Sequence, residues 1–449
     1  GHGHPVSHGG RHYREVMHRP GAPPHGDPPS RLVNRAPMLL VVGLVAFLAV
    51  TWTFSFGLPL GNSHEGRVLG QFALHVRNFW DLGPTGSSFG ADWRPFYDAP
   101  YTHHPPLLTG LHLLVSAVLG QGLWQLKAIS YLSGLATVPA LYWVGRRMGF
   151  GALPVAAATG ALVATPWWWV YGRLGLGFLP NLAMVGMVLL VADEATGRGL
   201  RRAAAATGAA VAASWHGAFL APLLWLWLVR RRGFDRTSMV VGAAMAAGGL
   251  VLLFWVAQGG GFSEWGNHLG DRIGGNWGWA DFAERQWRFA RDLLPVWYLV
   301  AALPALAAGL ADARTRFVTS ALSAMVVAFA VVPADGAWIH DYWNFSVLLA
   351  LFPGFAVLLD WVGGWSAQWL DSRLGGRLVG PVRLRIAGAT IGVAALLGLV
   401  VMNPLGRHDE YFAAPADAGR LVATVHPAPE QAAAWHAPYV PWATLIAYT

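Results

Sequence analysis

Long apolar segments alternate with shorter polar stretches along most of the chain. Eleven such segments follow one another, at residues 37–58, 105–119, 126–145, 152–171, 178–192, 203–229, 238–257, 293–311, 317–333, 342–362 and 385–402. An α-helix needs about 20 mostly apolar residues to cross a bilayer. The pattern therefore predicts an all-α polytopic membrane protein with about 11 transmembrane segments.

Two of these segments depart from the usual length. Residues 105–119 are too few for a full crossing, whereas residues 203–229 are enough for two short helices that meet at Trp215-His216-Gly217. Counting broken segments raises the predicted number to as many as 13. This interpretation also places His216 at the outer side of the membrane.

Arginine placement predicts the orientation, because short loops rich in Lys and Arg stay in the cytoplasm. Three clusters are formed by Arg230, Arg231, Arg232 and Arg236, by Arg314 and Arg316, and by Arg373, Arg377, Arg383 and Arg385. With these inside, residues 59–104 and 258–292 form two outer loops. If every segment crossed the membrane once, Arg146–Arg147 and Arg201–Arg202 would lie outside. An incomplete crossing by residues 105–119 and two short helices in residues 203–229 would together return both pairs to the cytoplasmic side.

The chain divides into three predicted parts. Residues 1–35 are polar and rich in His, Gly and Pro, which predicts a disordered cytoplasmic tail whose histidines could bind a divalent metal weakly. Residues 36–403 form the transmembrane domain. Residues 404–449 are polar, follow on the outer side and are too few for a complete domain, so we expect the start of a truncated one.

Composition agrees with a membrane protein and excludes several other classes. Hydrophobic residues make up 55% of the chain and charged residues 12%, a composition that a soluble monomer could not keep solvated. The net charge of +8 comes almost entirely from arginine, with Lys127 the only lysine. Positive-inside loops explain this excess, so no nucleic-acid partner is predicted. The absence of cysteine excludes disulfides and thiol chemistry.

The first outer loop opens with a candidate catalytic motif. Glu65-Gly66-Arg67 precedes residues 68–80, in which apolar side chains recur at helical spacing with Gln71, His75 and Asn78 between them. This spacing predicts an amphipathic helix on the membrane surface, with Glu65 in its first turn. Alternatively, Glu65 completes a capping box with Asn62.

The same loop ends in a second candidate motif, Tyr101-Thr102-His103-His104-Pro105-Pro106. The two prolines open the next helix well. Histidines just before a helix N-terminus can hold an anion such as a phosphate, through the helix dipole and their ring N–H groups. The alternative is that both histidines are polar anchors at the membrane interface.

These two motifs together resemble the GT-C class of membrane glycosyltransferases, in particular the branch of protein O-mannosyltransferases and lipid A aminoarabinose transferases. The resemblance covers about residues 60–405. Further similar motifs are Arg146-Arg147-Met148-Gly149-Phe150, Thr165-Pro166 with Tyr171-Gly172-Arg173, Ser214-Trp215-His216-Gly217, and His340-Asp341-Tyr342-Trp343.

The resemblance implies a GT-C fold and an inverting transfer of a sugar from a polyprenyl-phosphate donor. The acceptor would be a glycan, lipid or protein at the outer face of a bacterial plasma membrane. In that family a carboxylate in the first loop is the base, and a basic residue before the Pro-Pro meets the lipid phosphate. The chain departs from the family at His64, where many relatives have Asp, and at His216, where many have Lys.

The resulting site prediction has three groups of residues. Glu65 is the catalytic base, acting alone or with Asp92, Asp98 or Asp341. The predicted phosphate-binding residues are His103, His104, His216, Arg272 and Arg291, and the predicted substrate-binding residues are Arg67, Asp98, Tyr101, His340, Asp341 and Tyr342. No metal or other cofactor is predicted to be required, because no two-carboxylate metal motif is present.

Aromatic residues in the second outer loop leave two interpretations open. Trp265, Trp277, Trp279 and Trp287 could stack on a sugar or guide a lipid chain, or they could form an interfacial aromatic belt. The sequence leaves two alternative functions for the chain: a transporter or lipid flippase, and a non-catalytic membrane assembly subunit. The scarcity of charged residues in the apolar segments argues against transport.

Overall fold

A computed structural model describes residues 31–56, 64–92, 94, 100–102, 104–172, 198–258, 262–273, 275 and 277–373. The predicted segments 178–192 and 385–402 lie outside the described residues, as do residues 404–449 and nearly all of the N-terminal tail. The division into three parts therefore remains a prediction.

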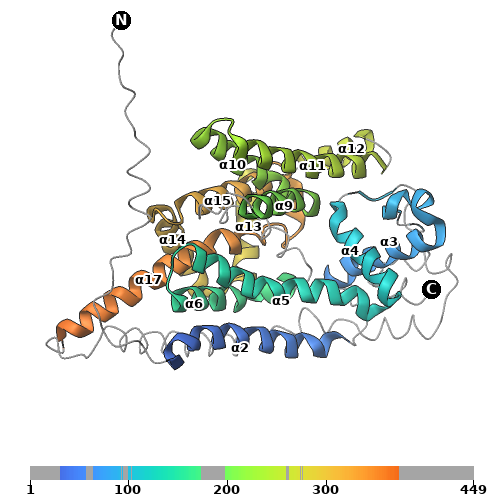
Figure 1. Ribbon diagram of the computed structural model, residues 1–449. Coiled ribbons are helices and arrows are strands. Elements are labelled where there is room, and N and C mark those ends of the chain that lie inside the picture. The colour runs from blue at the N-terminus through green and yellow to red at the C-terminus, as the bar shows by residue number, and fades with distance from the viewer. Residues whose placement is uncertain are drawn as a thin grey trace, which may run out of the picture.

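The described part is built of helices (Figure 1). Those before the undescribed residues 173–197 are α2 (Arg31–Phe56), α3 (His64–Gly86), the 3-10 helix η1 (Ser88–Gly90), α4 (Pro106–Leu119), α5 (Leu123–Arg147), α6 (Ala152–Val163) and α7 (Pro166–Tyr171). Those after them are α9 (Arg198–Ala213), α10 (Trp215–Arg232), α11 (Arg236–Gln258), α12 (Phe262–Ile273), α13 (Trp279–Leu293), α14 (Val296–Ala311), α15 (Arg316–Val331), α16 (Ala334–Ile339) and α17 (Val347–Arg373).

The apolar segments that fall on described residues correspond to these helices, and two of them are broken by local capping. The segment 203–229 becomes α9 and α10, which meet at Ser214, and the Ser214 hydroxyl accepts a hydrogen bond from the backbone N–H of Gly217. The predicted break is therefore confirmed, one residue before Trp215. The segment 152–171 breaks in the same way, because Thr165 caps α7 ahead of Pro166.

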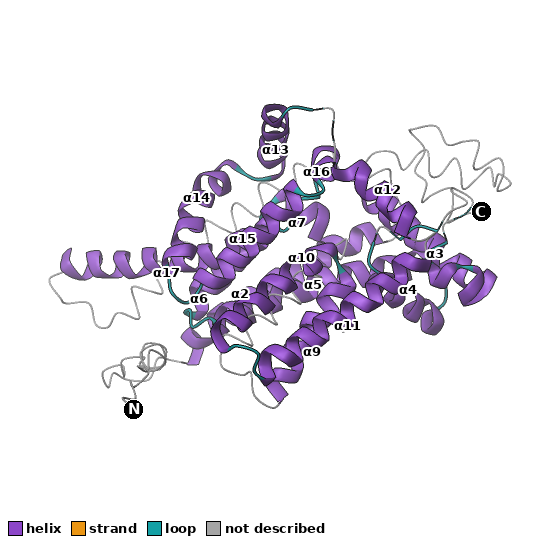
Figure 2. Cartoon of the chain, turned by 90° about the horizontal axis from the view of Figure 1, so that it is seen from above, coloured by secondary structure: helices purple, strands orange, loops and turns teal. Residues whose placement is uncertain are grey.

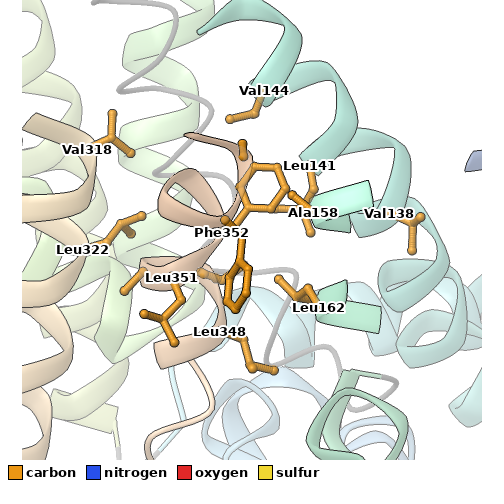
Figure 3. Packing of buried hydrophobic residues seen from close by; sticks show 14 of the residues in the cluster. Val138, Leu141, Val144, Ala158, Leu162, Val318, Leu322, Leu348, Leu351 and Phe352 are labelled. Atoms are coloured by element: carbon orange, nitrogen blue, oxygen red, sulfur yellow. The ribbon is translucent and has the colours of Figure 1, made fainter. Parts of the chain in front are cut away.

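Helix α17 lies at the centre of the hydrophobic core. Phe352, which is 1% exposed, packs with Leu348 among side chains of α5, α6 and α15 (Figure 3). Backbones also approach closely here, since a Cβ at Gly354 would overlap the carbonyl oxygen of Ala305 in α14. Small residues permit such contacts between apolar helices, where van der Waals packing replaces the hydrophobic effect.

Most of the arginine-rich turns gather at one end of the helices. Arg314 forms hydrogen bonds with Asp312 (2.7 Å) and Asp360 (3.4 Å), and its guanidinium lies 4.0 Å from the ring of Phe150 in the turn after Arg146–Arg147. At the end of α10, Arg231 lies over Trp227, whose ring stacks on Phe317 of α15. Helices α9 and α11 run parallel, because Gly208 of α9 faces Ala244 of α11 and Val211, further along α9, faces Gly248. Arg201–Arg202 at the start of α9 therefore belongs to this end as well.

The opposite end carries α3, the start of α4 and α12 (Figure 1). Viewed from above, α12 and α16 lie side by side near this end (Figure 2). Helices α3, α12 and α16 come from segments that are far apart in the sequence. Functional side chains of both predicted outer loops can therefore meet here.

By length and composition, two described helices can cross a membrane, at Arg236–Gln258 and Val347–Trp365. Helices α13 and α14 would supply a third span if they are counted together, although they are bent by 116° at their junction. Shorter apolar helices occur at Pro37–Thr53, Pro106–Leu119, Ala152–Val163 and Arg316–Val331. The number of 11 to 13 transmembrane segments stays a prediction.

Candidate functional site

Helix α3 brings the first motif to the site. It begins at His64, so Glu65 and Arg67 lie in its first turn, and their side chains are outside the described part of the structure. Its apolar positions Leu69 and Phe72 are buried, as the spacing predicted. The polar side chains of His75 and Asn78 are buried as well. Other parts of the protein therefore pack against the polar face of α3 as well as its apolar face.

Asp92 in the turn after α3 covers this polar side. Its carboxylate accepts hydrogen bonds from the backbone N–H (2.8 Å) and Nε (2.8 Å) of Arg94, and from Nδ2 of Asn78 (3.3 Å). Burial raises the pKa of Asp92, but the hydrogen bonds and charge of Arg94 outweigh this effect and lower it. Asp92 is therefore an ionised, fully paired carboxylate that fixes the loop, and it is poorly suited to assist Glu65 as a base.

The second motif is held by main-chain hydrogen bonds. The backbone N–H of Tyr101 donates to the carbonyl of Ala91 (2.7 Å), and the indole N–H of Trp255 in α11 donates to the carbonyl of His104 (2.9 Å). Burial lowers the pKa of His104 to about 4, so its ring is neutral at pH 7. The His104 ring can therefore offer a phosphate an N–H group but no positive charge. His103 and Asp98 lie outside the described residues.

A third group of predicted residues lies between α16 and α17. The hydroxyl of Tyr171 donates to Oδ1 of Asp341 (2.6 Å), and the Tyr171 ring lies 5.8 Å from that of Tyr342. The His340 ring lies 4.9 Å from the Tyr342 ring. Asp341 is thus engaged with Tyr171, and Tyr342 is held among aromatic rings.

His216 joins this third group at the start of α10. Its ring lies 3.9 Å from that of Phe329, and its Nε2 lies 3.4 Å from the carbonyl oxygen of Trp343. The Trp343 ring also stacks on Phe329. His216 therefore lies beside the His340–Trp343 motif, a proximity that the sequence did not indicate.

Arg272 of α12 connects the first loop with the third group. Burial raises the pKa of Tyr101 to about 12. A hydrogen bond with Gln71 and the charge of Arg272 both act in the opposite direction and lower this pKa. Burial and Tyr101 also raise the pKa of Tyr342, whereas Arg272 lowers it. One guanidinium thus acts on two buried phenols from separate segments. Tyr101, Arg272 and Tyr342 therefore lie near one another, and they place one positive charge beside two neutral phenols.

Arg291 does not join this convergence. It lies in the last turn of α13 with its side chain 61% exposed, and its Nε is 3.6 Å from Oδ1 of the neighbouring Asp292. The nearby tryptophans divide into two kinds. Trp277 stacks on Trp338 of α16, whereas Trp279 and Trp287 are exposed, which suits an aromatic belt for these two. The side chain of Trp265 is outside the described part.

No group of three or more His, Asp or Glu side chains within the described residues is arranged to hold a metal ion. The prediction that no metal is required remains a prediction, since Glu65 and Asp98 are not among these side chains.

The sequence interpretation missed four residues that shape the site. Tyr171 was noted only as part of a family motif, Gln71 and His75 only as polar positions of an amphipathic helix, and Trp255 not at all. A tyrosine or tryptophan near the end of an apolar segment is an ordinary interfacial residue. No local signal separates these residues from that background.

Comparison with known proteins agrees with this architecture. No protein-family model matches the sequence, and no curated protein matches it either. Among solved structures, the chain is similar to the archaeal oligosaccharyltransferase AglB from Archaeoglobus fulgidus, in complex with an inhibitory peptide and a dolichol-phosphate. That match has a TM-score of 0.53 and 13% sequence identity, and it covers 90% of this chain and 60% of AglB.

The protein has a GT-C fold. The expected fold class is thereby confirmed. A second similar structure is ArnT from Cupriavidus metallidurans bound to undecaprenyl phosphate, with a TM-score of 0.49, 16% identity, and coverage of 91% of this chain and 76% of ArnT. At such identities the GT-C likeness concerns the fold, and roles of individual residues come from this chain's own geometry.

Proposed function

We propose that this protein transfers a sugar from a polyprenyl-phosphate-linked donor to an acceptor on the outer face of the membrane, with inversion at the sugar carbon. The observation that carries the proposal is the convergence of Tyr101, Arg272 and Tyr342 at one end of a GT-C fold. A guanidinium near two neutral phenols can bind the donor phosphate and stabilise it as it leaves.

Besides binding the phosphate, the protein must supply a base for the acceptor hydroxyl. The acceptor hydroxyl attacks the anomeric carbon while the bond from that carbon to the phosphate oxygen breaks. The electron pair stays on the polyprenyl phosphate, and the acceptor proton goes to Glu65. Glu65 in the first turn of α3 is suited to this role, because α3 also carries Gln71, whose side chain is hydrogen-bonded to Tyr101.

The ligand of AglB supports the choice of donor. Dolichol-phosphate is a polyprenyl-type lipid phosphate, and it is bound by a protein of the same fold. The lipid has an apolar chain attached to a phosphate. The apolar chain could pack along the apolar helices while the phosphate binds at their polar end. The acceptor class, whether glycan, lipid or protein, stays open.

A direct assay tests the function. The purified protein in lipid vesicles is supplied with a radiolabelled polyprenyl-phosphate hexose and with a mixture of glycan, lipid and peptide acceptors. We expect label to appear in an acceptor with the opposite anomeric configuration. Movement of the lipid across the bilayer without any transfer would instead favour the flippase alternative.

We also expect a definite orientation, with the site outside and the arginine turns in the cytoplasm of a bacterium. Glu284 in α13 and Phe234 between α10 and α11 are each 72% exposed and lie in loops assigned to opposite sides. The chain has no native cysteine to give background. Glu284→Cys should react with an impermeant thiol reagent in intact cells, and Phe234→Cys only after lysis. The reverse pattern would contradict the orientation.

A further inference from the structure

Buried polar atoms without partners lie between α3 and α4. They are Nδ1 and Nε2 of His75, Nε2 of His112 and Oγ1 of Thr109. His75 and Thr109 are 1% exposed and His112 is 2% exposed. None of the four atoms has a hydrogen-bond partner among the described residues.

Such a concentration of unpaired atoms needs an explanation, because most buried polar side-chain atoms in folded proteins are hydrogen-bonded. The rings of His75 and His112 lie 6.1 Å and 4.7 Å from that of Phe72. A phenylalanine at either position could make the same ring contacts without burying unpaired nitrogens. The histidines therefore suit a partner that the described residues do not provide.

The chemistry of these atoms indicates the kind of partner. A neutral imidazole has one N–H donor and one acceptor nitrogen, and a hydroxyl likewise donates and accepts. Burial and the neighbouring His104 lower the pKa of His75 to about 3, although the charge of Asp92 raises it. The His75 ring is therefore uncharged. Asp92 is already paired with Arg94. A charged ligand would lose its hydration here and find no free counter-charge to compensate. An uncharged polyhydroxyl ligand needs no counter-charge, so it suits this position better.

The location relates this group to the candidate phosphate site. The His75 ring lies 6.2 Å from Tyr101, which in turn lies 5.7 Å from His104 and is influenced by Arg272. Phe72 lies among the rings of His75, His104 and His112, so these polar side chains surround one aromatic ring.

We propose that His75, Thr109 and His112 bind the hydroxyl groups of an uncharged sugar. The inference rests on the proposed function and adds a preference for a neutral sugar over one that carries a carboxylate or an amine. The sugar belongs either to the donor or to a glycan acceptor, and the chemistry of recognition is the same for both.

The test compares two probes on the purified protein: polyprenyl phosphate without sugar and the corresponding polyprenyl-phosphate hexose, with binding followed by native mass spectrometry. The variants are His75→Phe, which removes the polar atoms, and His75→Gln, which retains one donor and one acceptor. The matched control is Tyr298→Phe, which removes another buried and unpartnered polar atom, in α14. His75→Phe and Tyr298→Phe should both raise Tm by about 1–3 °C, since each removes an unpaired buried group.

If the donor sugar occupies the site, His75→Phe should weaken binding of the sugar-bearing lipid about tenfold and leave the sugar-free lipid unchanged. If a glycan acceptor occupies it, donor binding should stay unchanged and the KM for the acceptor should rise about tenfold. In either case His75→Gln should restore part of the loss, Tyr298→Phe should have no effect, and an amino-sugar or uronic-acid analogue should compete poorly.

Equal binding and equal KM in wild type and His75→Phe, with transfer intact, would overturn this inference alone. A wild-type protein that binds neither probe would overturn the proposed function and this inference with it. If His75→Phe does not fold, His112→Phe carries the same expectation.

Discussion

Replacing Glu65 with Gln should reduce the rate of sugar transfer by about 100- to 10,000-fold, because that is the usual contribution of a general base. The amide keeps the shape of the side chain but cannot take the acceptor proton. Donor binding should remain, since Tyr101, Arg272 and Tyr342 are untouched. The measurement is kcat at saturating donor, together with donor affinity.

The capping interpretation gives a different result for the same variant. A helix cap contributes about 1 kcal/mol to stability and nothing to the chemical step. Glu284→Gln is the matched control, because it makes the same change at an exposed carboxylate of α13. If Glu65→Gln retains near-full kcat and only lowers Tm, Glu65 is a capping residue and the base must be sought elsewhere in the first loop.

Replacing Arg272 with Gln should weaken binding of the donor by about 30- to 150-fold, which corresponds to about 2–3 kcal/mol for loss of a charge that pairs with the phosphate. Binding in the wild type should change little between pH 6 and pH 8, because a guanidinium stays charged over this range and His104, with a pKa of about 4, stays neutral. A decline of affinity around pH 6.5 would instead indicate that a charged histidine binds the phosphate.

Arg288→Gln is the control for this variant, since Arg288 is exposed on α13 and paired with Glu284. Arg291→Gln tests the sequence prediction for Arg291, and its exposed position leads us to expect the same small effect as Arg288→Gln. Equal losses in Arg272→Gln and Arg291→Gln would contradict the convergence at Tyr101 and Tyr342.

Sequence reasoning missed the break at Thr165 but was sufficient for most of the apolar helices that the structure describes, because apolar length and capping residues act locally. The break at Ser214 illustrates this, since a serine followed by a helix start and a glycine is a local signal. The burial of His75 could not be predicted in this way. Alternation along α3 suggests a solvated polar face, and only the turn carrying Asp92, which packs back onto Asn78, shows that this face is covered.

The sequence indicated several residues of the candidate site but not how they are arranged in space. Tyr101, Arg272 and Tyr342 were all named from the sequence, but nothing local indicates that three distant segments meet, or that Arg291 lies apart. The protonation state of His104 could not be predicted from the sequence for a related reason. The pKa of a histidine depends on what surrounds it, and the covering of His104 is a property of the tertiary structure.

Trp255 gives the bilayer a direct influence on the site. Helix α11 has 23 residues, so it is about 34 Å long, slightly longer than a hydrocarbon core of about 30 Å, and such helices usually adjust by tilting. Trp255 lies near the end of α11 and its indole holds the carbonyl of His104. A change in membrane thickness would therefore alter the tilt of α11 and move the peptide before Pro105 with it, so that hydrophobic mismatch acts on the site through one hydrogen bond.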